Sequence, residues 1–169
     1  YEIKSGKICI DGEDITNYNL DSLRSQIAVV LQDVFLFADT IYNNITLNNA
    51  AIHQEEVIAA AKEIGAHNFI MSLPGGYDYN VKERGKMLSS GQRQLIAFLR
   101  AYVSKPSILI LDEATSSIDI YLEELIQKAI DTITKNRTSI VIAHRLATII
   151  NADKIVVLDN GIVVEEGTH

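Results

Sequence analysis

The chain has 169 residues, 47% of them hydrophobic and 22% charged, which is the composition of one globular domain with a sizeable core. Its net charge of −7 and its lack of a long Lys/Arg stripe argue against a nucleic-acid partner. Its longest apolar runs fall far short of the roughly 20 residues that a membrane-spanning helix needs, and its single cysteine rules out an internal disulfide framework.

The N-terminal region is predicted to form short strands. Residues 7–11 alternate up to Asp11-Gly12, a turn signal between extended segments that predicts a β-hairpin. Cys9 lies between two isoleucines there, so we expect a small buried apolar side chain rather than a reactive thiol. A continuous apolar run over residues 27–31 predicts a strand that ends at Gln32.

A helical region is predicted next. Apolar residues recur at helical spacing within residues 41–68, which indicates helix over this range. Gly75-Gly76-Tyr77 marks a loop, and residues 92–103 form the following helix. That helix must stop before Pro106, because the residue preceding a proline avoids helical backbone angles.

Strands and helices alternate in the C-terminal part. The pattern predicts a strand at 108–111, a helix at 122–133, a strand at 138–142, a short helix to about residue 151, and a hairpin that pairs 154–158 with 162–166 across Asn160-Gly161. This order indicates an α/β fold with a mostly parallel sheet flanked by helices, antiparallel hairpins and a helical subdomain.

Two adjacent carboxylates follow the predicted strand at 108–111. Asp112 is expected at the carboxyl end of that strand, where open α/β sheets bind ligands and where a carboxylate can hold Mg²⁺. Glu113 comes next and is suited to polarise or deprotonate a water that attacks a γ-phosphate. The structural alternative is an acidic pair at a helix N-terminus, which leaves the following 114–119 segment unexplained.

The segment from Leu88 to Gln92 has the features of a helix start. Ser89 and Gln92, three residues apart, form a capping box. Capping does not require Gly91, whose missing side chain lets a phosphate approach the partially positive end of the helix. The pattern therefore indicates either a capped helix alone or a capped helix that binds phosphate.

Two further polar residues end predicted strands. His144 follows the 138–142 strand, from where its imidazole can hydrogen-bond a γ-phosphate oxygen, although a strand-end histidine is often structural. Gln32 follows the 27–31 strand and is uninformative by itself. The aromatics after it, Phe35 and Phe37, also have the ordinary reading of core residues.

Three segments in this order resemble the ATP-binding domain of ABC transporters, of the exporter type, with its P-loop NTPase-like fold. They are Leu88-Ser89-Ser90-Gly91-Gln92, Ile108-Leu109-Ile110-Leu111-Asp112-Glu113 and Ile140-Val141-Ile142-Ala143-His144. Residues 83–85 also resemble the exporter x-loop, apart from Lys82, which stands where exporters usually carry glycine.

The resemblance implies a role for each matching residue. ATP and Mg²⁺ are the implied ligands, with Asp112 and Gln32 at the metal and Glu113 and His144 as catalytic residues. The implied nucleotide contacts, some of them made to ATP of a partner domain, are Gln32, Leu88, Ser89, Ser90, Gly91, Gln92 and the D-loop residue Asp119.

One element of the family is missing from the sequence. The Gly-x-x-x-x-Gly-Lys-Ser/Thr phosphate loop appears nowhere in the 169 residues. We therefore expect a partial nucleotide-binding domain over 1–169, with a helical subdomain at about 33–104 and the ATPase core at 1–32 and 105–169. Without the phosphate loop we expect these residues alone to be inactive.

The resemblance implies an exporter domain that hydrolyses ATP at a dimer interface to drive transport. Its implied partners are a second nucleotide-binding domain and transmembrane domains, and its implied location is the cytoplasmic face of the membrane. A non-transport ABC ATPase of DNA repair or ribosomes is one alternative, and a non-catalytic binding module is another.

Overall fold

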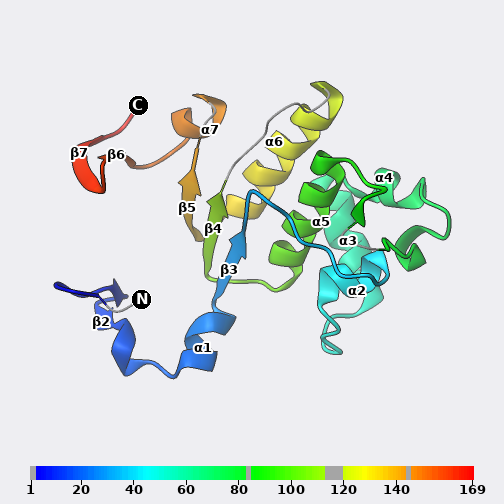
Figure 1. Ribbon diagram of the computed structural model, residues 1–169, viewed down its shortest axis with the longest axis horizontal. Coiled ribbons are helices and arrows are strands. Elements are labelled where there is room, and N and C mark those ends of the chain that lie inside the picture. The colour runs from blue at the N-terminus through cyan, green and yellow to red at the C-terminus, as the bar shows by residue number, and fades with distance from the viewer. Residues whose placement is uncertain (1–2, 83–84, 113–119, 144–145) are drawn as a thin grey trace.

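A computed structural model of the chain describes residues 3–82, 85–112, 120–143 and 146–169 (Figure 1). Its strands are β1 (Cys9–Ile10), β2 (Glu13–Asp14), β3 (Ile27–Val30), β4 (Ile108–Asp112), β5 (Thr138–Ile142), β6 (Ile155–Asp159) and β7 (Ile162–Gly167). Its α-helices are α1 (Leu20–Ser25), α2 (Ile41–Thr46), α3 (Gln54–Ile64), α4 (His67–Met71), α5 (Ser90–Val103), α6 (Ile120–Thr134) and α7 (Leu146–Ile150). Short 3-10 helices cover Ile15–Asn17 and Gly76–Asp78.

A three-stranded parallel sheet in the order β3-β4-β5 forms the centre, as the alternating sequence pattern predicts. The register aligns Val30, Leu111 and Val141 in one row across the three strands. Each strand is a short apolar run, which suits parallel strands because helices cover such sheets. The carboxyl ends of all three strands therefore lie at one edge.

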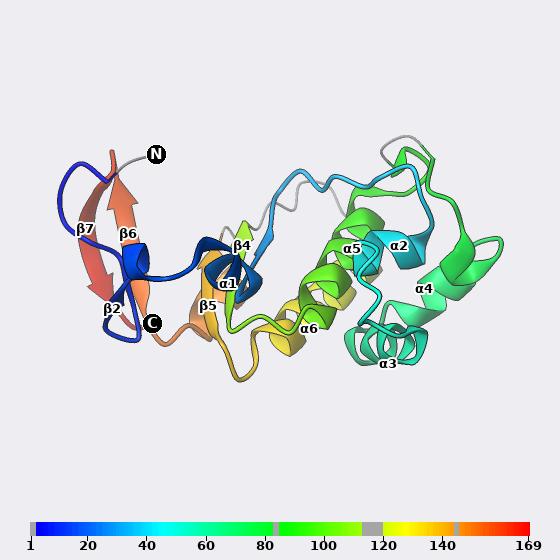
Figure 2. The same ribbon diagram turned by 90° about the horizontal axis from the view of Figure 1, so that it is seen from below.

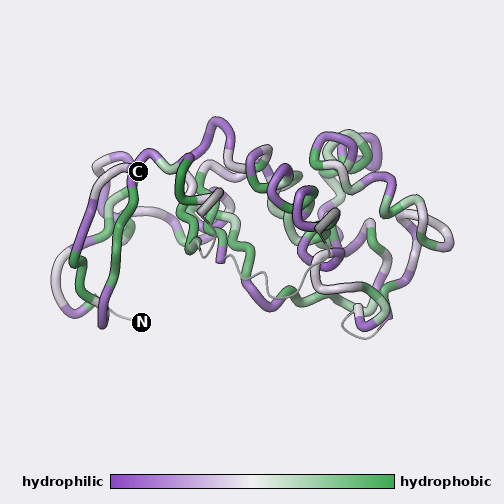
Figure 3. The backbone as a smooth tube through the Cα atoms, turned by 90° about the horizontal axis from the view of Figure 1, so that it is seen from above, coloured by the Kyte–Doolittle hydropathy of each residue, from purple (hydrophilic) through white to green (hydrophobic). Residues whose placement is uncertain are grey.

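Helices α5 and α6 pack together, and α5 also contacts β3, on one side of this sheet (Figure 1). The covered face carries Leu109 and Leu111, which are fully buried. On the opposite face Val29 is 53% exposed and Ile140 is 55% exposed. Figure 3 shows the hydrophobic stretches along the central strands and along β6 and β7. One face of the sheet is therefore core, and the other presents apolar side chains to solvent.

Two hairpins lie at the end of the molecule away from α3 and α4 (Figure 2). Both predicted turns are confirmed, because β1 pairs with β2 and β6 pairs with β7 in antiparallel fashion. Asn160 and Gly161 both have positive φ, which is the conformation that two-residue hairpin turns require. The prediction of a buried Cys9 is wrong: the thiol is exposed, because β1 has two residues and pairs only with β2.

The predicted helical range 41–68 is correct in type and wrong in continuity, because the structure divides it into α2, α3 and α4. Leu47 and Asn48 adopt left-handed backbone angles, which end α2. Gly65 ends α3 with a φ of 88°, and a Cβ there would lie 2.6 Å from Leu125 Cδ1. Every helix within the described ranges is too short or too polar to span a bilayer.

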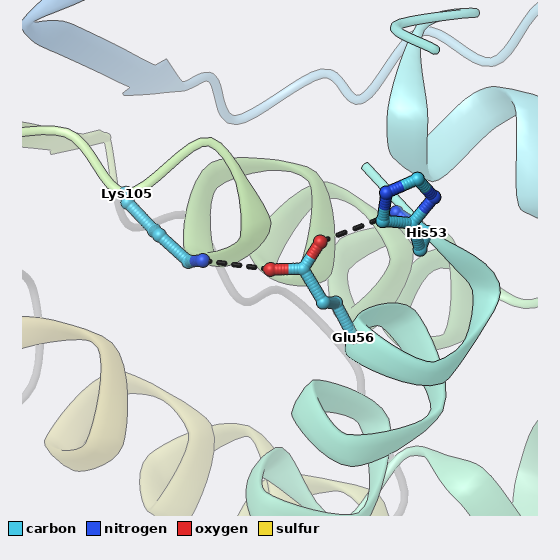
Figure 4. A network of polar contacts seen from close by, with 3 residues as sticks. All are labelled: His53, Glu56 and Lys105. Atoms are coloured by element: carbon cyan, nitrogen blue, oxygen red, sulfur yellow. Dashed lines mark hydrogen bonds and ion pairs between the residues drawn. The ribbon is translucent and has the colours of Figure 1, made fainter. Parts of the chain in front are cut away.

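The first turn of α3 is fixed by Glu56 (Figure 4). One carboxylate oxygen accepts a hydrogen bond from the backbone N–H of His53 at 3.2 Å, and the other pairs with Lys105 Nζ at 2.8 Å. The bond from Lys105 is the main cause that lowers the pKa of Glu56 below its ordinary value of 4.5, and the bond from His53 adds to it. Since Lys105 follows α5, this carboxylate joins the start of α3 to the end of α5.

Glu56→Gln is expected to lower the free energy of unfolding at pH 7 and to have no effect in acid. The pKa of Glu56 is lower in the folded state, so its stabilisation is complete above about pH 4.5 and is lost as the pH falls through the folded value. Urea unfolding between pH 3 and pH 8 measures the difference. Glu55→Gln, one residue earlier in α3, is the control, and a pH-independent difference for Glu56→Gln would contradict this account.

Candidate functional site

Two of the predicted site residues lie at the carboxyl edge of the central sheet. Asp112 is the last residue of β4, is half-buried and stands opposite Ile142 in the register of β5. Gln32 follows β3 by two residues and is exposed. Because β3 and β4 are parallel, the end of β3, just before Gln32, and the end of β4, at Asp112, lie at one edge of the sheet, as predicted (Figure 1).

Three predicted residues lie outside the described residues: Glu113, Asp119 and His144. Among the residues that the structure describes, no three His, Cys, Asp or Glu side chains are grouped closely enough to hold a metal ion. Asp112 and Gln32 offer a carboxylate and an amide oxygen, which are hard ligands of the kind Mg²⁺ prefers. Their chemistry fits Mg²⁺, and the metal role of both stays a prediction.

The predicted capping box at the start of α5 is confirmed. Ser89 Oγ accepts a hydrogen bond from the backbone N–H of Gln92 at 3.2 Å, and Gln92 Oε1 accepts one from the N–H of Ser89 at 2.9 Å. The hydroxyl of Ser89 uses only a lone pair in this arrangement. Its proton therefore stays available for donation to a ligand.

The start of α5 is also a source of backbone donors. Ser90 and Gly91 are the first two helical residues, so their N–H groups have no carbonyl four residues earlier to bind within the helix. The side chains of Ser89 and Ser90 are exposed. Together with the partial positive charge of the helix end, these donors can bind the oxygens of a phosphate group.

Gly91 has a packing role that the sequence did not reveal. It is buried, and a Cβ at this position would clash with Leu122 Cδ2 and lie 2.8 Å from Leu122 Cγ. The absence of a side chain thus lets α5 approach α6 closely. The contact with Leu122 is observed, whereas the access of a phosphate to Gly91 stays a prediction.

The loop that leads into α5 is anchored to the core. The side chain of Leu88 is buried, its carbonyl oxygen accepts a bond from Arg93 Nη1 at 2.6 Å, and its N–H donates to the carbonyl of Gly85 at 2.9 Å. Leu36 lies against Gly85, where an added Cβ would be 2.9 Å from Leu36 Cδ1. These contacts hold the position from which Ser89 begins the helix.

A pocket beside Gln32 was not predicted from the sequence. It has a volume of about 460 Å³ and is lined mainly by β3, the segment after it and the facing sides of α2 and α5, including Val29, Phe35 and Ala97. Phe35 and Phe37 are about half exposed and make an edge-to-face pair with ring centroids 5.1 Å apart. Neither of these two aromatic residues belongs to the core, which was their alternative interpretation. Leu36, between them, is buried instead.

Comparisons with known proteins agree with this geometry. A family model described as ABC transporter matches residues 1–116. The putative multidrug export ATP-binding/permease protein YgaD of Bacillus subtilis (strain 168) is 52% identical over 169 residues, which cover 100% of this chain and 29% of that protein. A putative multidrug export ATP-binding/permease protein of Staphylococcus aureus (strain NCTC 8325 / PS 47) is similar to the same extent and over the same shares.

A solved structure, that of a bacterial Atm1-family ABC exporter with ATP bound, superposes with a TM-score of 0.89 at 44% sequence identity. The match covers 100% of this chain and 30% of that one. The chain thus spans less than a third of the length of the proteins it matches.

Gly91→Ala is expected to destabilise the fold by about 1–3 kcal/mol, because the added methyl group overpacks the contact between α5 and Leu122. Urea unfolding measures the loss. Gly167→Ala is the matched control, since a Cβ there meets nothing within 4 Å.

Leu122→Ala, introduced together with Gly91→Ala, should make room for the new methyl group. The double variant is then less unstable than the sum of the two single changes. Strict additivity, or a Gly91→Ala variant as stable as Gly167→Ala, would contradict the packing role.

Proposed function

Because the chain belongs to the ABC transporter family and has the ABC ATPase fold, we propose that it is an ATP-binding domain of an exporter. In this proposal two such domains bind ATP and Mg²⁺ between them, and hydrolysis drives transport through membrane domains. The observation that carries the proposal is the exposed, capped start of α5, where Ser89 and two backbone N–H groups are free to bind an anion at the helix end.

The proposed roles follow from the chemistry of each position. Ser89 donates its hydroxyl proton to a γ-phosphate oxygen, together with the N–H groups of Ser90 and Gly91. Leu88 and Gln92 hold this donor set in place through the buried side chain and the capping box. Asp112 and Gln32 hold Mg²⁺, which when bound neutralises negative charge on the phosphates.

Glu113, Asp119 and His144 complete the proposed site by resemblance to the family. Glu113 accepts a proton from the attacking water, and His144 hydrogen-bonds the γ-phosphate. Asp119 contacts the opposite domain. Each of these three assignments can be tested by mutagenesis.

The start of α5 supports an interface with a second domain. Backbone donors and one hydroxyl can hold one side of a phosphate chain, while the lysine-bearing phosphate loop of the family pattern is absent from these 169 residues. We propose that the nucleotide at this helix is held on its other side by a partner nucleotide-binding domain, and that the 169 residues alone do not turn over ATP. A homodimer of a longer chain that carries the phosphate loop satisfies this requirement with two equal sites.

The pocket beside Gln32 supports a second interface. It is largely apolar, and the exposed Phe35–Phe37 pair lies at its margin, which suits a small apolar protein segment. We propose that a cytoplasmic segment of the membrane domains binds there, with the helical subdomain at about 33–104 as its platform. This places the chain at the cytoplasmic face of the membrane.

Glu113→Gln in the full-length protein is expected to lower the rate of ATP hydrolysis at least about a hundredfold, because a general base contributes at least that much. ATP binding should persist, since the amide keeps the shape of the side chain. Phosphate release and equilibrium binding of labelled ATP measure the two effects separately.

Glu124→Gln, on the exposed surface of α6, is the control that removes a charge without touching the site. Hydrolysis by Glu113→Gln at the parent rate would remove Glu113 from the catalytic role. Absence of hydrolysis and of ATP binding in the unmodified full-length protein would remove the proposed function itself.

A further inference from the structure

Arg100, near the end of α5, joins two segments that are distant in the sequence. Its Nε donates to the carbonyl oxygen of Asn44 at 2.8 Å, and its Nη1 and Nη2 donate to the carbonyl oxygen of Phe35 at 3.4 and 3.3 Å. The guanidinium thus binds one backbone carbonyl of α2 and one of the segment after Gln32.

The side chain of Asn44 holds the same segment from the other side. Asn44 is fully buried, its Oδ1 accepts a bond from the N–H of Phe37 at 2.8 Å, and its Nδ2 donates to the carbonyl of Phe37 at 3.0 Å. A buried amide that is saturated in this way is costly to remove, because its partners would lose their bonds in a dry environment. Arg100 and Asn44 therefore clamp both ends of the Phe35–Phe37 segment.

The middle of that segment is anchored as well. Leu36 is fully buried and lies against Gly85, in the loop that leads to Ser89. Phe35 and Phe37 on either side remain about half exposed. The segment thus presents two aromatic rings outward on a backbone that is fixed at three successive residues.

Polar groups such as those of the clamp are not the arrangement that stabilises a fold most. The partners of Arg100 in this clamp are neutral carbonyl oxygens, and desolvation lowers the pKa of its guanidinium below its ordinary value. An apolar residue of similar volume often serves as well or better in a buried position. A planar fork, in contrast, fixes two acceptors in one defined geometry, which a lysine cannot do.

We propose that Arg100 and Asn44 are positioning residues that make the Phe35–Phe37 segment and α5 move as one body. The inference rests on the proposed function, in which the membrane domains bind at Phe35 and Phe37. Arg100 and Ser89 lie eleven residues apart on α5, a span of about 16 Å along the helix axis. A displacement of the bound membrane segment is therefore carried along α5 to the phosphate donors at Ser89, Ser90 and Gly91.

Arg100→Gln and Arg100→Lys in the full-length protein in lipid vesicles test this inference. We expect kcat for ATP hydrolysis to fall about tenfold in Arg100→Gln, less in Arg100→Lys, with KM for ATP within about twofold of the parent value. The ATP-binding residues are untouched, so an unchanged KM assigns the loss to the connection between the membrane domains and the nucleotide site rather than to ATP binding; Arg100 also lines the pocket proposed for the membrane segment. Lys105→Gln, one turn beyond the clamp, removes a charge and an exposed ion pair and is the control.

Amide hydrogen exchange on the same proteins separates positioning from general stability. Exchange at the Phe37 N–H should accelerate in both Arg100 variants, while the amides of Leu95 to Leu99 in the centre of α5 keep the parent rate. Faster exchange throughout α5 would show a purely structural residue and overturn the inference.

An unchanged kcat in Arg100→Gln, in a protein whose parent form hydrolyses ATP, would overturn this inference alone. A parent protein without ATP hydrolysis would overturn the proposed function and, with it, the inference. A kcat that falls together with a large rise in KM for ATP would assign Arg100 to nucleotide binding and would also contradict the positioning role.

Discussion

The close packing of α5 determines where its neighbours α2, α3 and α6 can lie. Nine of its 14 residues are buried, and it contacts α2, α3, α6 and β3. Such a helix needs a small residue where a neighbour approaches, and Gly91 meets this need against Leu122. Because α5 is held on so many sides, its two ends are fixed relative to each other. The exposed start with Ser89 and the half-buried Arg100 near its end act from one rigid element.

The proposed site has two separate parts, and the rigidity of α5 lets one of them move as a unit. In the proposed function the start of α5 provides the phosphate donors, and the carboxyl edge of the sheet provides Asp112 and Gln32 for the metal. Neither part encloses a triphosphate, since backbone amides and a single hydroxyl cover one side of a phosphate group. A site that is completed by a second domain can open and close with the separation of the two domains. Energy from nucleotide binding is then available as movement of α5 and of the Phe35–Phe37 segment attached to it.

Most of the fold could be predicted from the sequence, because its signals are local. Apolar runs predicted β3, β4 and β5, the Asn160-Gly161 turn predicted the hairpin of β6 and β7, and the capping box predicted the start of α5. The errors arose where tertiary contacts decide. Leu47 adopts left-handed angles that its side chain does not favour, and Cys9 is exposed because, among the described elements, β1 pairs with β2 alone. The Arg100–Asn44 clamp joins residues up to 65 positions apart, and neither the clamp nor the pocket carries a periodic pattern that a sequence reveals.

In the proposed function, the phosphate donors at α5 require a phosphate loop that these 169 residues do not contain. Mg²⁺-dependent ATP hydrolysis measured side by side, on the 169-residue chain and on the same chain joined at its N-terminus to the family's phosphate-loop segment, tests it most directly. The account predicts hydrolysis by the longer protein and none by the 169-residue chain. Hydrolysis by the 169-residue chain alone, or by neither protein, would contradict it.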